Sequence, residues 1–173
     1  ISPAPVETAR PPADLARWAD RISGWTDVHR AAIAISLFDA PSHGLPDLYH
    51  YARAILDGTR SESERNRLAG LAYLRYAGWL EHGLIDATTR APRQLVDEEA
   101  EALVRRLERA FDEGDAIQAI EASAPHVRDY DALRLEMMRV MAVTPIWSGV
   151  APGASLAVGD QGDRVDQLRT RMT

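Results

Sequence analysis

Apolar residues in this chain recur at intervals of three and four positions, and glycine or proline interrupts the pattern repeatedly. This spacing places apolar side chains on one face of an α-helix. The segments Leu15–Ile22 and Ala100–Phe111 are clear examples, and no segment shows the strict alternation that is typical of a half-buried strand. The apolar fraction of 46% and the charged fraction of 27% are ordinary for a globular protein. The sequence therefore predicts an all-α fold.

Capping and breaking residues divide residues 13–143 into about seven predicted helices. A capping box of Ser61 and Glu64 begins the most clearly marked helix, and Gly83 ends it. Pro46 is predicted to lie in the first turn of the helix before it, where proline is tolerated. The other helices are expected over the apolar stripes of residues 15–22, 28–38, 48–56, 100–111, 115–124 and 130–141.

The ends of the chain differ in composition from this helical region. Residues 1–12 contain four prolines and no apolar period, which indicates an extended leader. Residues 144–158 have the composition of a linker, and residues 159–173 combine a Gly-Asp turn with a short apolar stripe at helical spacing. We therefore expect a leader, a helical domain over residues 13–143, a linker, and the start of a further module.

The charge and the hydropathy of the chain argue against nucleic-acid binding and against a membrane-spanning segment. The net charge is −6 and the arginines are scattered, so the basic patch that nucleic-acid binding requires is missing. No apolar run reaches the roughly 18 residues of a membrane span. We expect neither nucleic acid nor a membrane span.

The sequence contains few patterns typical of catalytic, metal-binding or cofactor-binding sites. The chain has no cysteine, no two of its five histidines are four residues apart, and no phosphate-binding glycine loop occurs, so we expect no catalytic thiolate, metal or cofactor. We interpret His43 as a loop cap and His50 as a residue of an exposed helix face. Tyr73, Tyr76 and Trp79 surround one helix and are interpreted as core rather than as a sugar-binding surface.

Three stretches of the chain resemble, in this order, the scaffold region of large periplasmic murein L,D-transpeptidases. They are "HGLPDLYHYARAIL", "LAYLRYAGWLEHGLID" and "YDALRLEMMRVMAVTPIWSGVAPGASLAVGDQGDRVDQLRTRM". In that family a Tyr-x-x-Leu helix is followed by a tryptophan, a proline-glycine linker, Gly-Asp and a Val-x-x-Leu-Arg helix. The corresponding residues here are Tyr130, Leu133, Trp147, Pro152, Gly153, Gly159, Asp160, Val165, Leu168 and Arg169.

The resemblance implies that residues 159–173 are the first helix of a truncated peptidoglycan-binding module. The implied binding positions are Gly159, Asp160, Val165, Leu168 and Arg169. Independently, Asp160 has the type and position of an N-cap for this helix. The helix carries a short apolar stripe that a complete module would cover, so it either frays or docks on a surface. We favour docking on the helical domain or on a second chain, and docking on a second chain would give a homo-oligomer.

The chain departs from the family pattern at two points. The scaffold helix usually begins with an aspartate and carries a threonine four residues later, whereas this chain has Asn66 and Gly70. The family's cysteine nucleophile is absent, so the resemblance implies that the transferase domain lies elsewhere.

The resulting hypothesis is a non-catalytic scaffold fragment of an L,D-transpeptidase that acts in peptidoglycan cross-linking and cell-wall remodelling. Its implied partners are peptidoglycan or the missing transpeptidase domain, and its implied location is the periplasm or cell envelope, after removal of a signal peptide. The alternative is a free-standing helical adaptor or peptidoglycan-binding protein of the envelope that lacks the enzyme domain. An enzyme with an unrelated active site is the weakest hypothesis, because no acid, base and nucleophile converge in the sequence.

Overall fold

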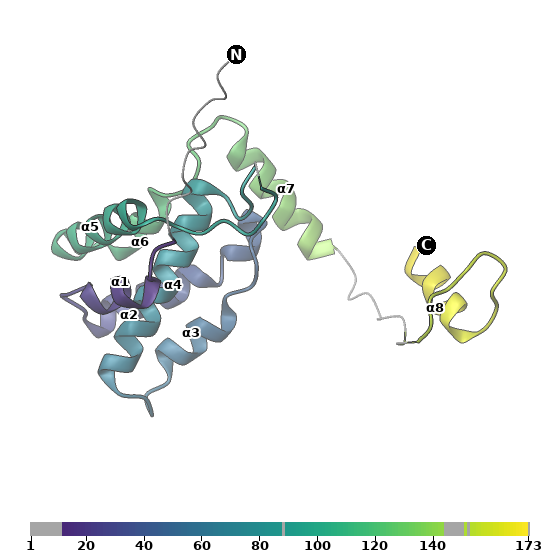
Figure 1. Cartoon of the computed structure of the whole chain (residues 1–173), viewed down its shortest axis with the longest axis horizontal. Coiled ribbons are helices and arrows are strands. Elements are labelled where there is room, and N and C mark those ends of the chain that lie inside the picture. Colours follow the sequence, from purple (N-terminus) through teal and green to yellow (C-terminus); the bar gives the residue numbers. More distant parts are fainter. Residues whose placement is uncertain (1–11, 88, 144–150, 152, 173) are drawn as a thin grey trace, which may run out of the picture. The chain divides into compact units, whose positions relative to one another are not determined.

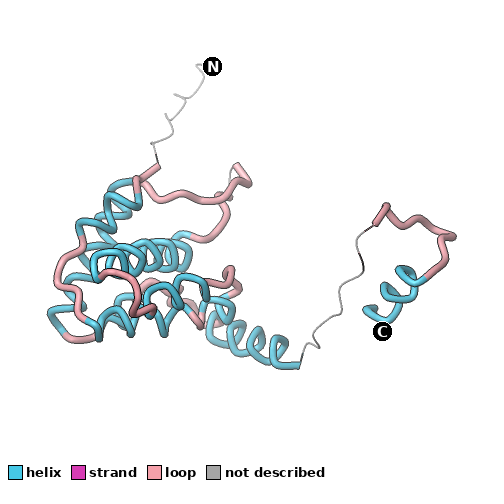
Figure 2. Tube along the Cα trace, turned by 90° about the horizontal axis from the view of Figure 1, so that it is seen from below, coloured by secondary structure: helices cyan, strands magenta, loops and turns pink. Residues whose placement is uncertain are grey.

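The computed structural model describes residues 12–87, 89–143, 151 and 153–172, and these residues form helices and loops without a strand (Figure 1 and Figure 2). The prediction of an all-α fold is confirmed, as are seven α-helices before the C-terminal one. The elements are α1 (Leu15–Arg21), α2 (Asp27–Leu37), the 3₁₀-helix η1 (Ala40–His43), α3 (Tyr49–Leu56), α4 (Glu62–His82), α5 (Asp97–Glu113), α6 (Ala116–Glu121), α7 (Tyr130–Val143) and α8 (Asp163–Met172).

The chain forms two compact units, which divide between Leu135 and Glu136, within α7. Residues 1–11 of the predicted leader and residues 144–150 and 152 of the predicted linker lie outside the described residues. No helix in the described part of the chain is both long enough and apolar enough to cross a membrane.

Helix α4 is the central element of the first unit, where it contacts α1, α2, α3, α5 and α6. The Ser61 hydroxyl accepts a hydrogen bond from the Glu64 backbone N–H, which satisfies one of the free donors at the helix start. The Glu64 carboxylate bonds to Arg60, so only half of the predicted capping box forms. Gly83 ends the helix with a φ of 84°, as predicted.

The departure from the family pattern at Gly70 has a packing reason. An ideal Cβ at Gly70 would lie 3.0 Å from the Ala19 Cβ and 3.1 Å from the Ile22 Cδ1. A side chain at this position would push α1 away from α4, and the glycine permits their close approach.

Helix α1 and the residues that follow it are also joined to α5 by polar side chains. The Trp18 indole N–H donates to the Asp97 carboxylate at 2.7 Å, and the Ser23 hydroxyl donates to the Glu108 carboxylate at 3.1 Å. The Asp97 carboxylate also accepts from Arg17, and these two donors hold the pKa of Asp97 below its usual value. These hydrogen bonds therefore hold α1 and α5 against one another in the first unit.

The loop before α3 differs from the prediction. Pro46 lies outside the helix, because α3 begins at Tyr49, whose backbone N–H donates to the Asp47 carboxylate at 2.6 Å. The 3₁₀-helix η1 ends at Gly44, which adopts the left-handed conformation with a φ of 71°.

Candidate functional site

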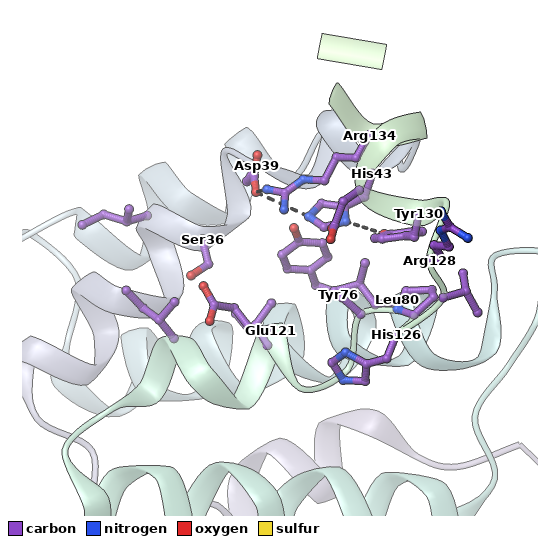
Figure 3. A pocket seen from close by; sticks show the side chains of 17 residues that line it. Ser36, Asp39, His43, Tyr76, Leu80, Glu121, His126, Arg128, Tyr130 and Arg134 are labelled. Atoms are coloured by element: carbon purple, nitrogen blue, oxygen red, sulfur yellow. Dashed lines mark hydrogen bonds and ion pairs between the residues drawn. The ribbon is translucent and has the colours of Figure 1, made fainter. Parts of the chain in front are cut away.

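The first unit has a cavity of about 650 Å³ that is open to solvent on one side, and this volume is within the usual size range of small-molecule sites (Figure 3). Its walls come from α2, η1, α4, α6, the loop that follows α6, and the first turns of α7. The apolar wall includes Leu80, Ile117, Ile120 and Val127. The polar side chains that line the cavity are Ser36, Asp39, His43, Tyr76, Glu121, His126, Arg128, Tyr130, Asp131 and Arg134.

A hydrogen-bonded group, which we call the His43 cluster, comprises Asp39, Ser42, His43, Tyr130 and Arg134. The His43 Nδ1 lies 2.5 Å from the Tyr130 hydroxyl, and its Nε2 lies 3.4 Å from the Asp39 carboxylate. Arg134 donates to the Ser42 hydroxyl at 3.0 Å and forms an ion pair with Asp39. Ser42 in turn donates to Asp39 at 2.7 Å, so every member of the cluster has a partner.

Two helical turns place these side chains together. Asp39 and His43 are four residues apart at the ends of η1, and Tyr130 and Arg134 are four residues apart at the start of α7. Residues with this spacing lie on the same face of an α-helix, and η1 brings Asp39 and His43 within contact distance across its single turn. In Figure 3 the α7 pair meets the η1 pair at one end of the cavity.

The electrostatics of the cluster favour neutral aromatic groups. Burial lowers the pKa of His43, whose side chain is 6% exposed, and the nearby Arg134 charge lowers it further against the opposing effect of Asp39. A neutral ring with its proton on Nε2 donates toward Asp39, and its Nδ1 then accepts the Tyr130 hydroxyl proton. Burial raises the pKa of both Tyr130 and Tyr76. The phenols therefore stay protonated and can donate hydrogen bonds in the cavity.

The Tyr76 hydroxyl differs from those of Tyr73 and Tyr130 because no described residue bonds to it, and we call it an open hydroxyl. Tyr76 is only 1% exposed, and its ring meets the His43 ring edge-on at 6.0 Å between centroids. Among the described residues its hydroxyl has no hydrogen-bond partner, and in Figure 3 it points toward the Asp39 and Arg134 side chains. By contrast, the equally buried Tyr73 hydroxyl donates to the Leu103 carbonyl at 3.1 Å. The prediction that these two tyrosines belong to the core is confirmed.

The sequence interpretation of His43 as a loop cap is wrong, because its ring is buried in the cluster and bonds to side chains on η1 and α7. His50 is exposed on α3, as expected. Sequence reasoning missed the cluster because its halves are far apart in the chain. The signal that was present is the repeated spacing of four, in Asp39 with His43 and in Tyr130 with Arg134.

The five predicted binding positions all lie in the second unit. Asp160 does not cap α8, since α8 begins three residues later and the Asp160 carboxylate accepts from the Ala157 backbone N–H at 2.8 Å instead. Gly159 has a φ of 100° in this turn. Val165 is half-buried, whereas Leu168 and Arg169 are exposed on α8. No ligand contact tests their binding role, which stays a prediction.

Further bonds connect the segment before this turn to α8. The Arg164 guanidinium donates to the carbonyls of Ala151 and Ala154, at 2.8 and 2.6 Å, and Ala151 donates to the Gln167 side chain at 2.8 Å. Trp147 and Pro152, which carry part of the resemblance, lie outside the described residues. In the described part of the chain, no three His, Asp or Glu side chains are grouped so that they could hold a metal ion.

Comparison with known families matches residues 18–137 to the family described as Scaffold domain. The chain belongs to this family. The matched region of the scaffold domain contains α2 to α6 and every residue that lines the cavity. No curated protein and no solved structure matches the chain.

Proposed function

We propose that this scaffold domain is the non-catalytic scaffold region of an L,D-transpeptidase that cross-links peptidoglycan in the cell envelope. The observation that carries the proposal is the family match over residues 18–137, in a chain whose three ordered motifs resemble the scaffold region of these enzymes. Its role is to hold the transferase domain and a peptidoglycan-binding module, which α8 would begin.

The chemistry of the chain supports a role without catalysis. Acyl transfer by the route of these enzymes passes through a thioester and needs a cysteine thiolate, and the chain has no cysteine. The phenols in the cavity stay protonated, and a protonated phenol is a poor nucleophile.

The test compares the purified chain with the complete gene product. Both are incubated with tetrapeptide-containing muropeptides, and cross-linked products are measured by liquid chromatography and mass spectrometry. We expect cross-links from the complete product, none from the chain, and loss of cross-links when residues 18–137 are deleted from the complete product. Cell fractionation should place the complete product in the periplasm or envelope.

Two results would contradict the proposal. Cross-links formed by the purified chain would show that it is itself an enzyme. A complete gene product without transpeptidase activity that still binds isolated cell walls would favour the free-standing adaptor instead.

A further inference from the structure

We propose that a second cavity of the scaffold domain binds a small carboxylate whose remainder is an apolar ring or chain. We call this cavity the Trp79 cleft, and its walls are residues 12–15, the second half of α4 and the loop of residues 83–95. The inference goes beyond the proposed function, because it assigns a ligand to the domain, and it does not depend on the transpeptidase role. It depends on the apolar lining of the cleft and on the sign of the charges beside it.

The walls of the Trp79 cleft are held in place by backbone hydrogen bonds. The Ala13 N–H donates to the Leu95 carbonyl at 2.7 Å, which joins the segment before α1 to the loop before α5. Within this loop, the Arg93 N–H donates to the Leu84 carbonyl at 2.9 Å. The cleft has a volume of about 400 Å³, which is within the usual size range of small-molecule sites. It is therefore a preformed concave site that is open to solvent on one side.

The lining of the cleft is mostly apolar. Except for two arginines and one glutamine, every described residue that lines it is apolar or glycine. Gly78 belongs to the lining, and an ideal Cβ there would lie 2.9 Å from the Leu95 Cδ1, so the glycine lets Leu95 pack directly on α4. Trp79 is half-buried, so its ring packs partly on the core and also borders the cleft. An apolar ring or chain in the cleft would cover apolar surface that water now contacts.

The charged groups of the cleft select an anion. Among the described residues that line it none is acidic, although the chain has 26 acidic and 20 basic residues. Arg93 is neutralised by an ion pair with Glu99. Arg75 contacts no carboxylate in the described part of the chain, and its guanidinium carbon lies 5.7 Å from the centre of the Tyr51 ring. The unpaired charge beside the cleft is therefore positive.

Asp14, which lies between two residues of the lining, does not neutralise Arg75. Its carboxylate accepts hydrogen bonds from the Ala16 and Arg17 backbone N–H groups, at 3.1 and 3.2 Å, and so caps α1. The Arg75 guanidinium is left to pair with a carboxylate from outside the chain.

The positions of Arg75 and Trp79 suit a ligand that has both a carboxylate and an apolar part. The two residues are four apart on α4, so their side chains lie on the same face of the helix. A carboxylate bound to two N–H donors of the Arg75 guanidinium would place its apolar part beside Trp79. Because Arg75 is exposed, solvent weakens the ion pair, and most of the affinity comes from apolar contact. The charge then decides which of several ligands of similar shape binds best.

The test is a titration of the ¹⁵N-labelled chain, followed by two-dimensional NMR, with 4-phenylbutyrate, 4-phenylbutanol and 4-phenylbutylamine as matched probes. We expect the Trp79 indole N–H signal, assigned by its loss in Trp79→Phe, to shift, while the signal of Trp25, which lies outside the lining, stays in place. The Kd for phenylbutyrate should be about threefold or more below that for phenylbutanol, as for a solvent-exposed ion pair, with phenylbutylamine weakest.

A peptide probe identifies the source of the carboxylate. The dipeptide acetyl-Ala-Phe presents a free C-terminal carboxylate next to the same phenyl ring. If it binds more tightly than phenylbutyrate, the end of a peptide is the natural ligand, and the reverse order indicates a free carboxylic acid.

Two variants separate the charge from general effects. Arg75→Gln should weaken phenylbutyrate binding about threefold to fivefold and leave phenylbutanol binding unchanged, because only the ion pair is lost. Arg53→Gln is the matched control, since Arg53 is also an exposed arginine whose guanidinium lies near a tyrosine ring, 5.8 Å from that of Tyr49, but is outside the lining. It should leave the binding of all three probes unchanged.

The proposal is overturned if no probe binds, if phenylbutanol or phenylbutylamine binds as tightly as phenylbutyrate, or if the shifts fall outside the Trp79 cleft. It is also overturned if Arg75→Gln binds phenylbutyrate as the parent chain does. Well-dispersed spectra of each variant show that a loss of binding does not come from unfolding.

Discussion

Tyr73 and Tyr76 of α4 offer a matched pair of substitutions, because both rings are buried and only one hydroxyl has a protein partner. Tyr73→Phe removes the hydrogen bond to the Leu103 carbonyl at 3.1 Å. A neutral hydrogen bond of this kind contributes about 0.5–1.5 kcal/mol to the free energy of unfolding. Tyr76→Phe removes a hydroxyl without a partner, so the free energy of unfolding should stay equal or rise by up to about 1 kcal/mol.

Urea denaturation followed by circular dichroism measures the difference. With a slope of about 2 kcal/mol per molar urea, the loss at Tyr73→Phe lowers the unfolding midpoint by about 0.5 M, and Tyr76→Phe leaves it unchanged or raises it. The parent chain is the reference for both. A Tyr76→Phe variant destabilised as much as Tyr73→Phe would show that its hydroxyl is bonded within the protein, and the argument for an open hydroxyl would fail.

Three further substitutions test other features. Gly70→Val should destabilise the chain by about 1–3 kcal/mol in urea, because the new side chain overlaps Ala19, whereas Gly58→Ala, with open space around it, should change stability by less than about 0.5 kcal/mol. Unfolded His43 binds a proton below about pH 6.5, whereas folded His43 resists it, so the free energy of unfolding should fall from about pH 6.5 toward pH 5, and the slope should flatten in His43→Gln. Ser61→Ala should cost about 1 kcal/mol in urea melts; no loss would show that the cap is dispensable.

The helices could be predicted because their signals are local. The apolar period and the stops at Gly83 and Gly114 lie within the segments that they define, and the structure follows them. The 3₁₀-helix η1 was missed because it is short and depends on contacts with α7. Asp160 is a residue type that often caps helices, but its carboxylate accepts a hydrogen bond from the Ala157 backbone N–H instead.

The cavity could not be predicted in the same way. The sequence does not indicate the role of His43, because its partner Tyr130 is 87 residues away and only tertiary packing brings the two together. The sequence likewise could not show that Tyr76 differs from Tyr73, since both occupy the same buried face of α4 and only the position of α5 provides a partner for one of them.

The bonds between α1 and α5 have a consequence for synthesis of the protein. Trp18 and Ser23 donate hydrogen bonds to carboxylates that lie 79 and 85 residues further along the chain and are therefore synthesised later. At about 5–20 residues per second, α1 leaves the ribosome roughly 4–16 s before these partners. During that interval the Trp18 indole lacks its acceptor. A pause in translation before Asp97 would prolong that state.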